Sequence, residues 1–308
     1  MVCAGRPVPL AGWQEELADP EEADRGSAAQ FARWAFSLLT LAACGAACAQ
    51  DAREIVRQSI QLDQANWLRM ANYTWVERSR ERHFDSQNRV TSTKQEGWET
   101  LILGGEPYRR LIERDDQPLP PNERRKQQEK LDKTAVRLDR ETPEQKQRRL
   151  AEYERERRRD REFLLEIADA YDFHREPDQT LDGQPVWVID GVPRPGYQPK
   201  KRDAKALLKI RGRIWIEKAG YQWVRIEAET TATISFGLFL ARLNPGAKLE
   251  FEQARINNEV WLPKREFVSG SGRIGLLKKL KEDQETTWTN YRKFDVESRI
   301  VSSGPKGP

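Results

Sequence analysis

The sequence is poor in the side chains from which many catalytic and metal sites are built. It contains three cysteines, Cys3, Cys44 and Cys48, and none after residue 48. The rest of the chain therefore has no disulfide framework, no thiol nucleophile and no cysteine-ligated zinc site. The two histidines, His83 and His174, lie in unrelated segments, and neither has a second histidine or a cysteine at metal-ligand spacing. We therefore predict no metal site and no cofactor.

Motifs for nucleophilic catalysis are also missing. The chain has neither the G-x-S-x-G elbow of many hydrolases nor a G-x-x-x-x-G-K-[ST] phosphate loop. Carboxylate pairs are abundant, but they are concentrated in a segment with the composition of a solvated helix. General acid–base catalysis instead needs carboxyl groups that burial or coupling has perturbed. The sequence therefore indicates a non-enzymatic protein without catalytic residues.

Charges of the two signs nearly balance, with 53 basic and 49 acidic residues and a net charge of +4. So small a net charge gives no broad positive field for nucleic acid. The most basic run, residues 155–161, is interleaved with Glu156 and Asp160 and flanked by Glu154 and Glu162, which repel phosphates. We predict no nucleic-acid partner.

Residues 31–49 have the pattern of an export signal. Arg25 and Arg33 precede an apolar run of about ten residues, which is too short to span a bilayer and typical of a signal peptide. Ala47-Cys48-Ala49 predicts cleavage before Gln50, so residues 1–49 comprise a removable signal and an acidic N-terminal extension. Leu41-Ala-Ala-Cys44 instead resembles a lipobox, in which Cys44 would carry a lipid anchor. Both routes predict a periplasmic protein, attached to the outer membrane only if Cys44 is lipidated.

Hydrophobic periodicity predicts a mainly antiparallel β domain over residues 50–300, followed by a flexible tail, 301–308. A helix of about residues 51–70 comes first, because Ile55, Val56 and Ile60 share one face. Strands follow at about 73–84, 89–103 and 107–114, and the strand pattern resumes after residue 171. Glycines 270 and 272 are interpreted as turn residues.

Residues 119–170 interrupt this pattern with a highly charged segment. Thr142 and Gln145 have the form of a capping box, and Pro143 falls at the favoured first helical position. These signals predict two helices, of about 122–139 and 143–170, that form a long charged hairpin. Because residues 152–162 are almost wholly Glu, Arg and Asp, we expect the hairpin to project from the β domain or to bridge to another element.

Three strand motifs carry a family resemblance. They are Gly183-Gln-Pro-Val-Trp-Val-Ile-Asp190 with the Pro-rich loop that follows it, Ile214-Trp-Ile-Glu217, and Trp223-Val-Arg-Ile-Glu227. Their order after the leading helix resembles the outer-membrane lipoprotein-sorting (LolA/LolB-like) superfamily, in an uncharacterised envelope branch, over about residues 51–300. The resemblance implies an α+β fold, in which a curved antiparallel sheet forms an unclosed β-barrel around an apolar cavity that takes acyl chains. The charged insertion is a departure that a carrier does not need.

By position, the resemblance also implies a set of cavity-facing residues. They are Trp75, Trp98, Trp187, Trp215, Trp223, Phe236, Leu238 and Phe239. The apolar stretches 234–243 and 274–277 either fill the core or line the cavity. Two hypotheses follow: a periplasmic carrier for an acyl chain, lipid or lipidated protein, and an envelope scaffold that docks a protein partner through its helical insertion. An apolar cavity of about 300 Å³ or more favours the carrier.

Overall fold

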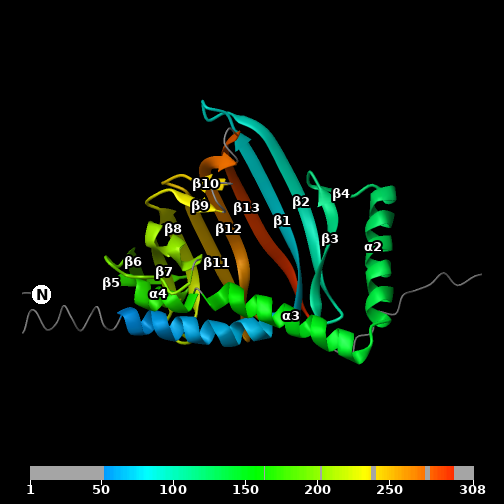
Figure 1. The fold of residues 1–308 in the computed structure, drawn as a ribbon, viewed down its shortest axis with the longest axis horizontal. Helices are drawn as coiled ribbons and strands as arrows, with labels where there is room; N and C mark the ends of the chain where they lie inside the picture. The colour runs from blue at the N-terminus through cyan, green and yellow to red at the C-terminus, as the bar shows by residue number, and fades with distance from the viewer. Residues whose placement is uncertain (1–51, 163, 202, 237–240, 275–277, 295–308) are drawn as a thin grey trace, which may run out of the picture. The chain divides into compact units, whose positions relative to one another are not determined.

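An antiparallel sheet forms the body of the domain. The computed structural model describes residues 52–162, 164–201, 203–236, 241–274 and 278–294, all within one unit of residues 48–308. Eleven strands follow one another in the order β4-β3-β2-β1-β13-β12-β11-β8-β7-β6-β5, and β9 and β10 extend the sheet beside β12. Since the path does not join β4 to β5, the sheet is an unclosed barrel, and the predicted α+β fold class is confirmed (Figure 1).

Every strand pair in this sheet is antiparallel, and most strands are joined by tight turns. The strands are β1 (Tyr73–Phe84), β2 (Val90–Leu103), β3 (Glu106–Arg114), β4 (Gln117–Pro118), β5 (Tyr171–Leu181), β6 (Gln184–Pro193), β7 (Ile210–Glu217), β8 (Trp223–Thr230), β9 (Ile234–Phe236), β10 (Ala241–Leu243), β11 (Lys248–Ile256), β12 (Val260–Ile274) and β13 (Lys278–Lys293). The two-residue turns Gly104-Gly105, Asp115-Asp116 and Asp182-Gly183 have positive φ at both positions, as type I′ hairpins require.

The charged insertion joins the two open edges of the sheet. Helices α2 (Pro121–Asp139), α3 (Pro143–Glu162) and α4 (Leu164–Ala170) carry the chain from β4 at one edge to β5 at the other. In Figure 1, α2 stands beside β3, and α3 turns away from it to run along the sheet beside the helix of residues 52–70. The two predicted helices are therefore present, and α3 bridges the domain.

Arginine side chains fasten α3 to its surroundings. The Arg149 guanidinium binds Glu106 at 2.6 Å and Glu141 at 3.0 Å, and donates to the carbonyl oxygen of Gly104 at 3.1 Å. The Arg157 guanidinium lies 4.9 Å from the ring centroid of Trp67, in the N-terminal helix, and 5.2 Å from that of Tyr153. A helix with few apolar residues is thus held by ion pairs and cation–π contacts.

The two faces of the sheet differ in what covers them. Ile189 and Ile216 point to the face on which the helix of residues 52–70 packs, where they contact Ile55; we call this the helix-covered face. Side chains alternate along a strand, so Val188 and Trp215 point to the opposite, open face, where they form a separate cluster.

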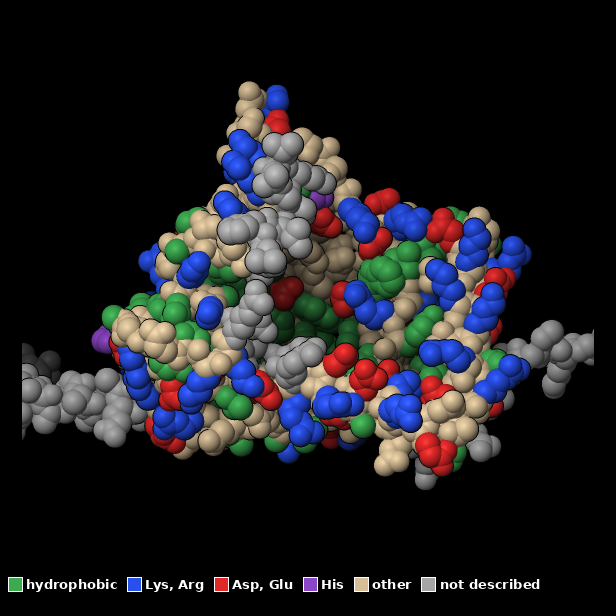
Figure 2. Space-filling model, in the orientation of Figure 1, with side chains coloured by type: hydrophobic (Ala, Val, Ile, Leu, Met, Phe, Trp, Pro, Cys, Tyr) green, Lys and Arg blue, Asp and Glu red, His purple; other side chains and the backbone are tan. Residues whose placement is uncertain are grey.

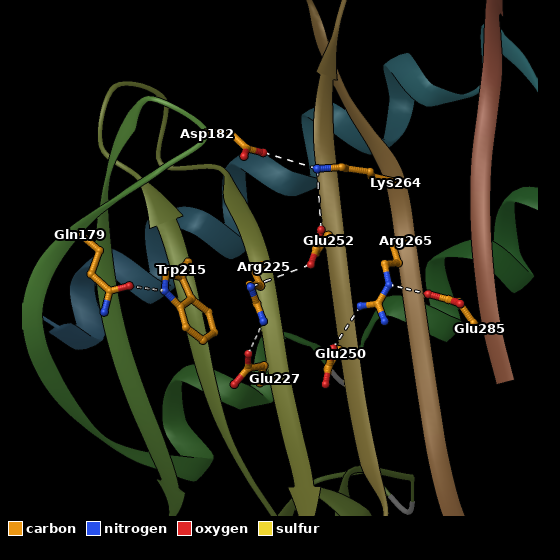
Figure 3. Close-up of polar contacts among 10 residues, drawn as sticks. All are labelled: Gln179, Asp182, Trp215, Arg225, Glu227, Glu250, Glu252, Lys264, Arg265 and Glu285. Atoms are coloured by element: carbon orange, nitrogen blue, oxygen red, sulfur yellow. Dashed lines mark hydrogen bonds and ion pairs between the residues drawn. The ribbon is translucent and has the colours of Figure 1, made fainter. Parts of the chain in front are cut away.

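Ion pairs cover much of the open face (Figure 3). Arg225 binds Glu227 at 2.6 Å, and Arg265 lies 2.8 Å from Glu285 and 3.1 Å from Glu250. The pairs of Arg265 join neighbouring strands, where opposite charges each contribute about 0.2–1 kcal/mol, whereas Arg225 and Glu227 lie on the same strand. Pairing on this face therefore compensates part of the high charge content of the strands.

Candidate functional site

An apolar pocket of about 520 Å³ lies on the helix-covered side of the sheet, at one end of strands β7, β8, β11, β12 and β13. Its lining is mainly aliphatic. The apolar lining residues are Ala206, Ile210, Ala228, Ile234, Leu243, Ala247, Leu249, Val268 and Leu280. The volume exceeds the roughly 300 Å³ at the lower end of ligand pockets, which is the cavity size that favours the carrier hypothesis.

Small residues create this hollow. Ala228 and Ala247 present only a methyl group, and Gly270 presents none. A Cβ atom on Gly270 would lie 3.0 Å from the Ala247 side chain and 3.2 Å from that of Leu243, closer than ordinary van der Waals contact, so glycine here lets these two side chains pack against β12. A Cβ on Gly272 would lie 2.2 Å from the backbone oxygen of Arg242, so only glycine lets β10 pair with β12 here.

The interpretation of glycines 270 and 272 as turn residues is wrong, because both lie inside β12. Residues 270–275 also have the G-x-G-x-x-G spacing of a dinucleotide-binding loop, which requires a turn between a strand and a helix. Since Gly270 and Gly272 instead pair with β13 within the sheet, the spacing has no such role.

A row of aromatic side chains lies on the same face of the sheet as the pocket. The ring centroids of Trp223 and Phe251 are 5.3 Å apart, and those of Phe251 and Trp288 are 6.0 Å apart. Phe251 shares its face of β11 with Leu249, two residues or roughly 7 Å along the strand. The aromatic row therefore lies on the same face as the pocket, beyond its lining, and Figure 2 shows this side of the sheet hollowed near its centre, with hydrophobic side chains inside the hollow.

A half-buried carboxyl group lies beside the aromatic row. Glu266 is the cross-strand partner of both Phe251 and the buried Thr286. Burial, and secondarily the charge of Glu77, raise the pKa of the Glu266 carboxyl above its ordinary value. Glu77 itself is paired with Arg109 at 2.6 Å. Glu266 thus takes up a proton more readily than a solvated carboxyl and can donate a hydrogen bond.

The sequence-predicted tryptophans are distributed over the whole sheet. Trp187 and Trp223 both pack against the core beneath the N-terminal helix, and Trp187 lies on Tyr221, with centroids 4.8 Å apart. Trp75 and Trp98 are also on the helix-covered side, on β1 and β2. Trp215 points to the open face, where its Nε1 donates to Gln179 at 3.1 Å.

Three predicted contacts and the lipidation site have no described side chain. Phe236 belongs to β9, but its side chain lies outside the described part of the chain, as do residues Leu238, Phe239 and Cys44. The residues that the sequence argument missed are small or aliphatic, chiefly Ala228, Leu249 and Val268, or aromatic outside the quoted motifs, such as Phe251 and Trp288. The sequence signal for the residues on β8 is that positions 226, 228 and 230 lie on the same face of one strand. The same alternation is also part of the pattern that predicts the hairpin of β7 and β8.

His83 lies between two carboxylates that the sequence keeps far apart. Its Nε2 is 2.9 Å from Glu81 on the same strand, and its Nδ1 is 3.4 Å from Glu282 on β13. Spacing along the chain predicts no such cluster, because Glu282 reaches it only through the pairing of β1 with β13.

Comparison with known proteins finds similarity in fold alone. No protein-family model matches the chain, and no curated protein matches it in sequence. The fold matches solved structures of the LolA superfamily and its neighbours. A domain from Vibrio parahaemolyticus named for outer membrane lipoprotein sorting is 13% identical, with a TM-score of 0.34 over 80% of this chain and 95% of that chain.

Two further solved structures show the same kind of match. A DUF1329 family protein from Desulfovibrio piger is 11% identical, with a TM-score of 0.31 over 82% of this chain and 95% of that chain. The LolA superfamily protein NE2245 from Nitrosomonas europaea is 7% identical, with a TM-score of 0.28 over 80% and 94%. None of the described helices is long and apolar enough to cross a membrane.

Proposed function

We propose that the domain is a non-enzymatic periplasmic binding module that shelters the apolar part of a ligand: an acyl chain, a lipid or a lipidated protein. The aliphatic pocket of about 520 Å³ carries this proposal. Such a lining binds by removing apolar surface from water, at about 25 cal/mol per Å², and offers little directional chemistry.

The outline of the site favours a chain over a compact ring system. The lining follows β12 from Val268 to Arg273. Five residue steps of strand at about 3.3 Å each correspond to roughly 17 Å. An extended acyl chain matches a long, narrow site of this kind.

The scaffold hypothesis started from the charged insertion, which has another explanation in this fold. The helices connect the two edges of the sheet, and the contacts of Arg149 and Arg157 hold α3 in place. A partner that docked on the insertion would use exposed apolar residues such as Val136 on α2, which is 49% exposed. Because the topology itself requires the helices, the pocket supports the carrier more directly.

A charge placed in the pocket tests the proposal. Val268 lines the pocket and is 40% exposed, so Val268→Asp leaves the packed core intact while introducing a carboxylate where an acyl chain would lie. Val192→Asp is the matched control, because Val192 is an exposed strand valine, 52% exposed, on the open face. Burying an unpaired charge against a ligand costs several kcal/mol.

The measurement is native mass spectrometry with lipid extraction, on protein purified from a bacterial periplasm and again after delipidation and addition of fatty acid. We expect bound acyl lipid in the wild type and in Val192→Asp, and at least tenfold less in Val268→Asp. A wild-type protein that stays free of lipid when fatty acid is added would refute the carrier function.

A further inference from the structure

An imidazole and two carboxylates meet where β1 pairs with β13. His83 and Glu81 are two residues apart on β1, so their side chains point to the same face of the strand. Glu282 on β13 is the direct cross-strand partner of His83. One nitrogen of the imidazole and one oxygen of each carboxylate lie within 4.8 Å of one another. These three residues, which we call the histidine cluster, bring together groups that commonly bind transition metals.

The two carboxylates of the histidine cluster have no basic partner other than His83. Within the described ranges, no lysine or arginine lies within ion-pair distance of Glu81 or Glu282. Lys94 is the cross-strand partner of Glu81 on β2, but it binds Glu96 at 3.0 Å instead. A neutral imidazole therefore lies between two carboxylates whose charge no neighbouring cation balances.

The second histidine of the chain has similar neighbours but lacks this property. His174 on β5 lies 4.0 Å from Glu176, two residues along its strand, and Asp190 on β6 is its cross-strand partner. Arg213 binds the two carboxylate oxygens of Asp190 at 2.5 and 2.7 Å. The carboxylate opposite His174 is thus already engaged, whereas the one opposite His83 is available for a metal ion.

We propose that the histidine cluster is a binding site for zinc or a similar divalent transition-metal ion. Imidazole nitrogen and carboxylate oxygen bind zinc at about 2.0–2.2 Å, so two ligands of a tetrahedral zinc ion lie roughly 3.4 Å apart. The ligand atoms of the cluster, at most 4.8 Å apart, need to approach one another by about 1.4 Å. The three side chains are between 33% and 44% exposed, which leaves them room for this movement.

The ion connects two distant parts of the chain. Its two positive charges balance the two carboxylates, and three protein ligands leave the fourth tetrahedral position for water or another small ligand. The pairing of β1 with β13 joins residues about 200 positions apart. An ion that binds only the folded protein stabilises it by mass action, so zinc strengthens this part of the sheet. The inference does not depend on the carrier function.

Isothermal titration calorimetry with zinc chloride tests the site. The untagged full-length protein is used, with Cys3, Cys44 and Cys48 alkylated so that thiols do not bind the metal. The variants are His83→Ala and the more conservative Glu282→Gln, and His174→Ala is the matched control. Magnesium chloride is titrated in parallel, and thermal melting with and without zinc shows whether each variant is folded and whether the metal stabilises it.

We expect the wild type and His174→Ala to bind one zinc ion per chain, with dissociation constants within about twofold of each other. His83→Ala and Glu282→Gln should each bind zinc at least about tenfold more weakly, since each lacks one of three ligands. Zinc should raise the melting temperature of the wild type and not that of His83→Ala. Magnesium should bind far more weakly than zinc, because it prefers oxygen ligands to imidazole.

A wild-type protein that binds no zinc overturns the proposal, and so does zinc binding that is unchanged in both His83→Ala and Glu282→Gln. A loss in His174→Ala as large as that in His83→Ala also overturns it, because the metal then binds exposed histidines without a built site. Magnesium binding as tight as that of zinc would show that the imidazole is not a ligand.

Discussion

The size and lining of the apolar pocket predict how affinity depends on acyl-chain length. Each methylene that leaves water contributes about 0.8 kcal/mol, so affinity should rise about fourfold per carbon. A methylene occupies roughly the volume of a water molecule, about 30 Å³. A pocket of about 520 Å³ therefore holds at most roughly 17 methylenes. We expect a steep rise in affinity that reaches a plateau at or before about this length.

Filling the pocket should move the plateau. Ala228→Phe places an aromatic ring beside Leu249 and Val268, and its ring carbons take the place of about six methylenes. The plateau should therefore occur at chains about six carbons shorter, with the slope per carbon unchanged. Ala219→Phe, in the exposed turn between β7 and β8, is the control.

The assay is displacement of 1-N-phenylnaphthylamine by saturated fatty acids of 6 to 20 carbons, below their critical micelle concentrations. An affinity independent of chain length would show that the aliphatic lining does not hold the chain. A plateau that stays in place in Ala228→Phe would show that chains bind outside the pocket.

Two further predictions concern the groups around this site. Burial raises the pKa of the Glu266 carboxyl in the folded protein. The stabilisation that protonation gives is therefore fully present below the ordinary carboxyl pKa and is lost as the pH rises through the raised value. Glu266→Gln should therefore melt at a higher temperature than the wild type at pH 8 and at the same temperature at pH 3.5; an equal difference at both pH values would contradict this. Arg157→Ala should lower the free energy of unfolding in urea by about 1–2 kcal/mol, through loss of its contacts with Trp67 and Tyr153. Arg155 is exposed on the same helix, so Arg155→Ala should change the free energy of unfolding by less than about 0.5 kcal/mol. Equal effects of the two substitutions would show that the contacts of Arg157 do not fasten α3.

Local patterns in the sequence were sufficient to predict the main elements. The capping box is formed as expected, because Gln145 accepts from the Thr142 backbone N–H at 3.0 Å and donates its own N–H to the Thr142 hydroxyl at 3.3 Å. Alternation and turn residues likewise predicted β1 to β3 and the hairpin of β7 and β8. The pairing of β1 with β13 joins residues about 200 positions apart and has no local signature. The role of the helices as a bridge between the sheet edges depends on that pairing, so it could not be predicted.

Large aromatic residues were an unreliable guide to the site. In the motif Ile214-Trp215-Ile216, Trp215 and Ile216 are both buried, on opposite faces, because the helix covers one side of the sheet here and Trp215 packs in an apolar cluster on the other. Alternation shows that the faces differ without showing which one borders a cavity. A cavity is also formed where side chains are small, and Ala228 and Gly270 look in sequence like ordinary strand and turn residues.

The two faces of the sheet together explain how a pocket persists in a domain of this size. A hollow in an apolar interior forfeits packing contacts and destabilises a fold. Here the helix of residues 52–70 covers β6 to β8, where Ile189 and Ile216 are fully buried, and the start of β12, where Asn66 bonds the backbone of Trp261. Beyond that region, cross-strand ion pairs such as Arg265 with Glu285 hold the strands together on the open face. The sheet therefore keeps its register where its other face is hollow, and apolar surface remains for a ligand to cover.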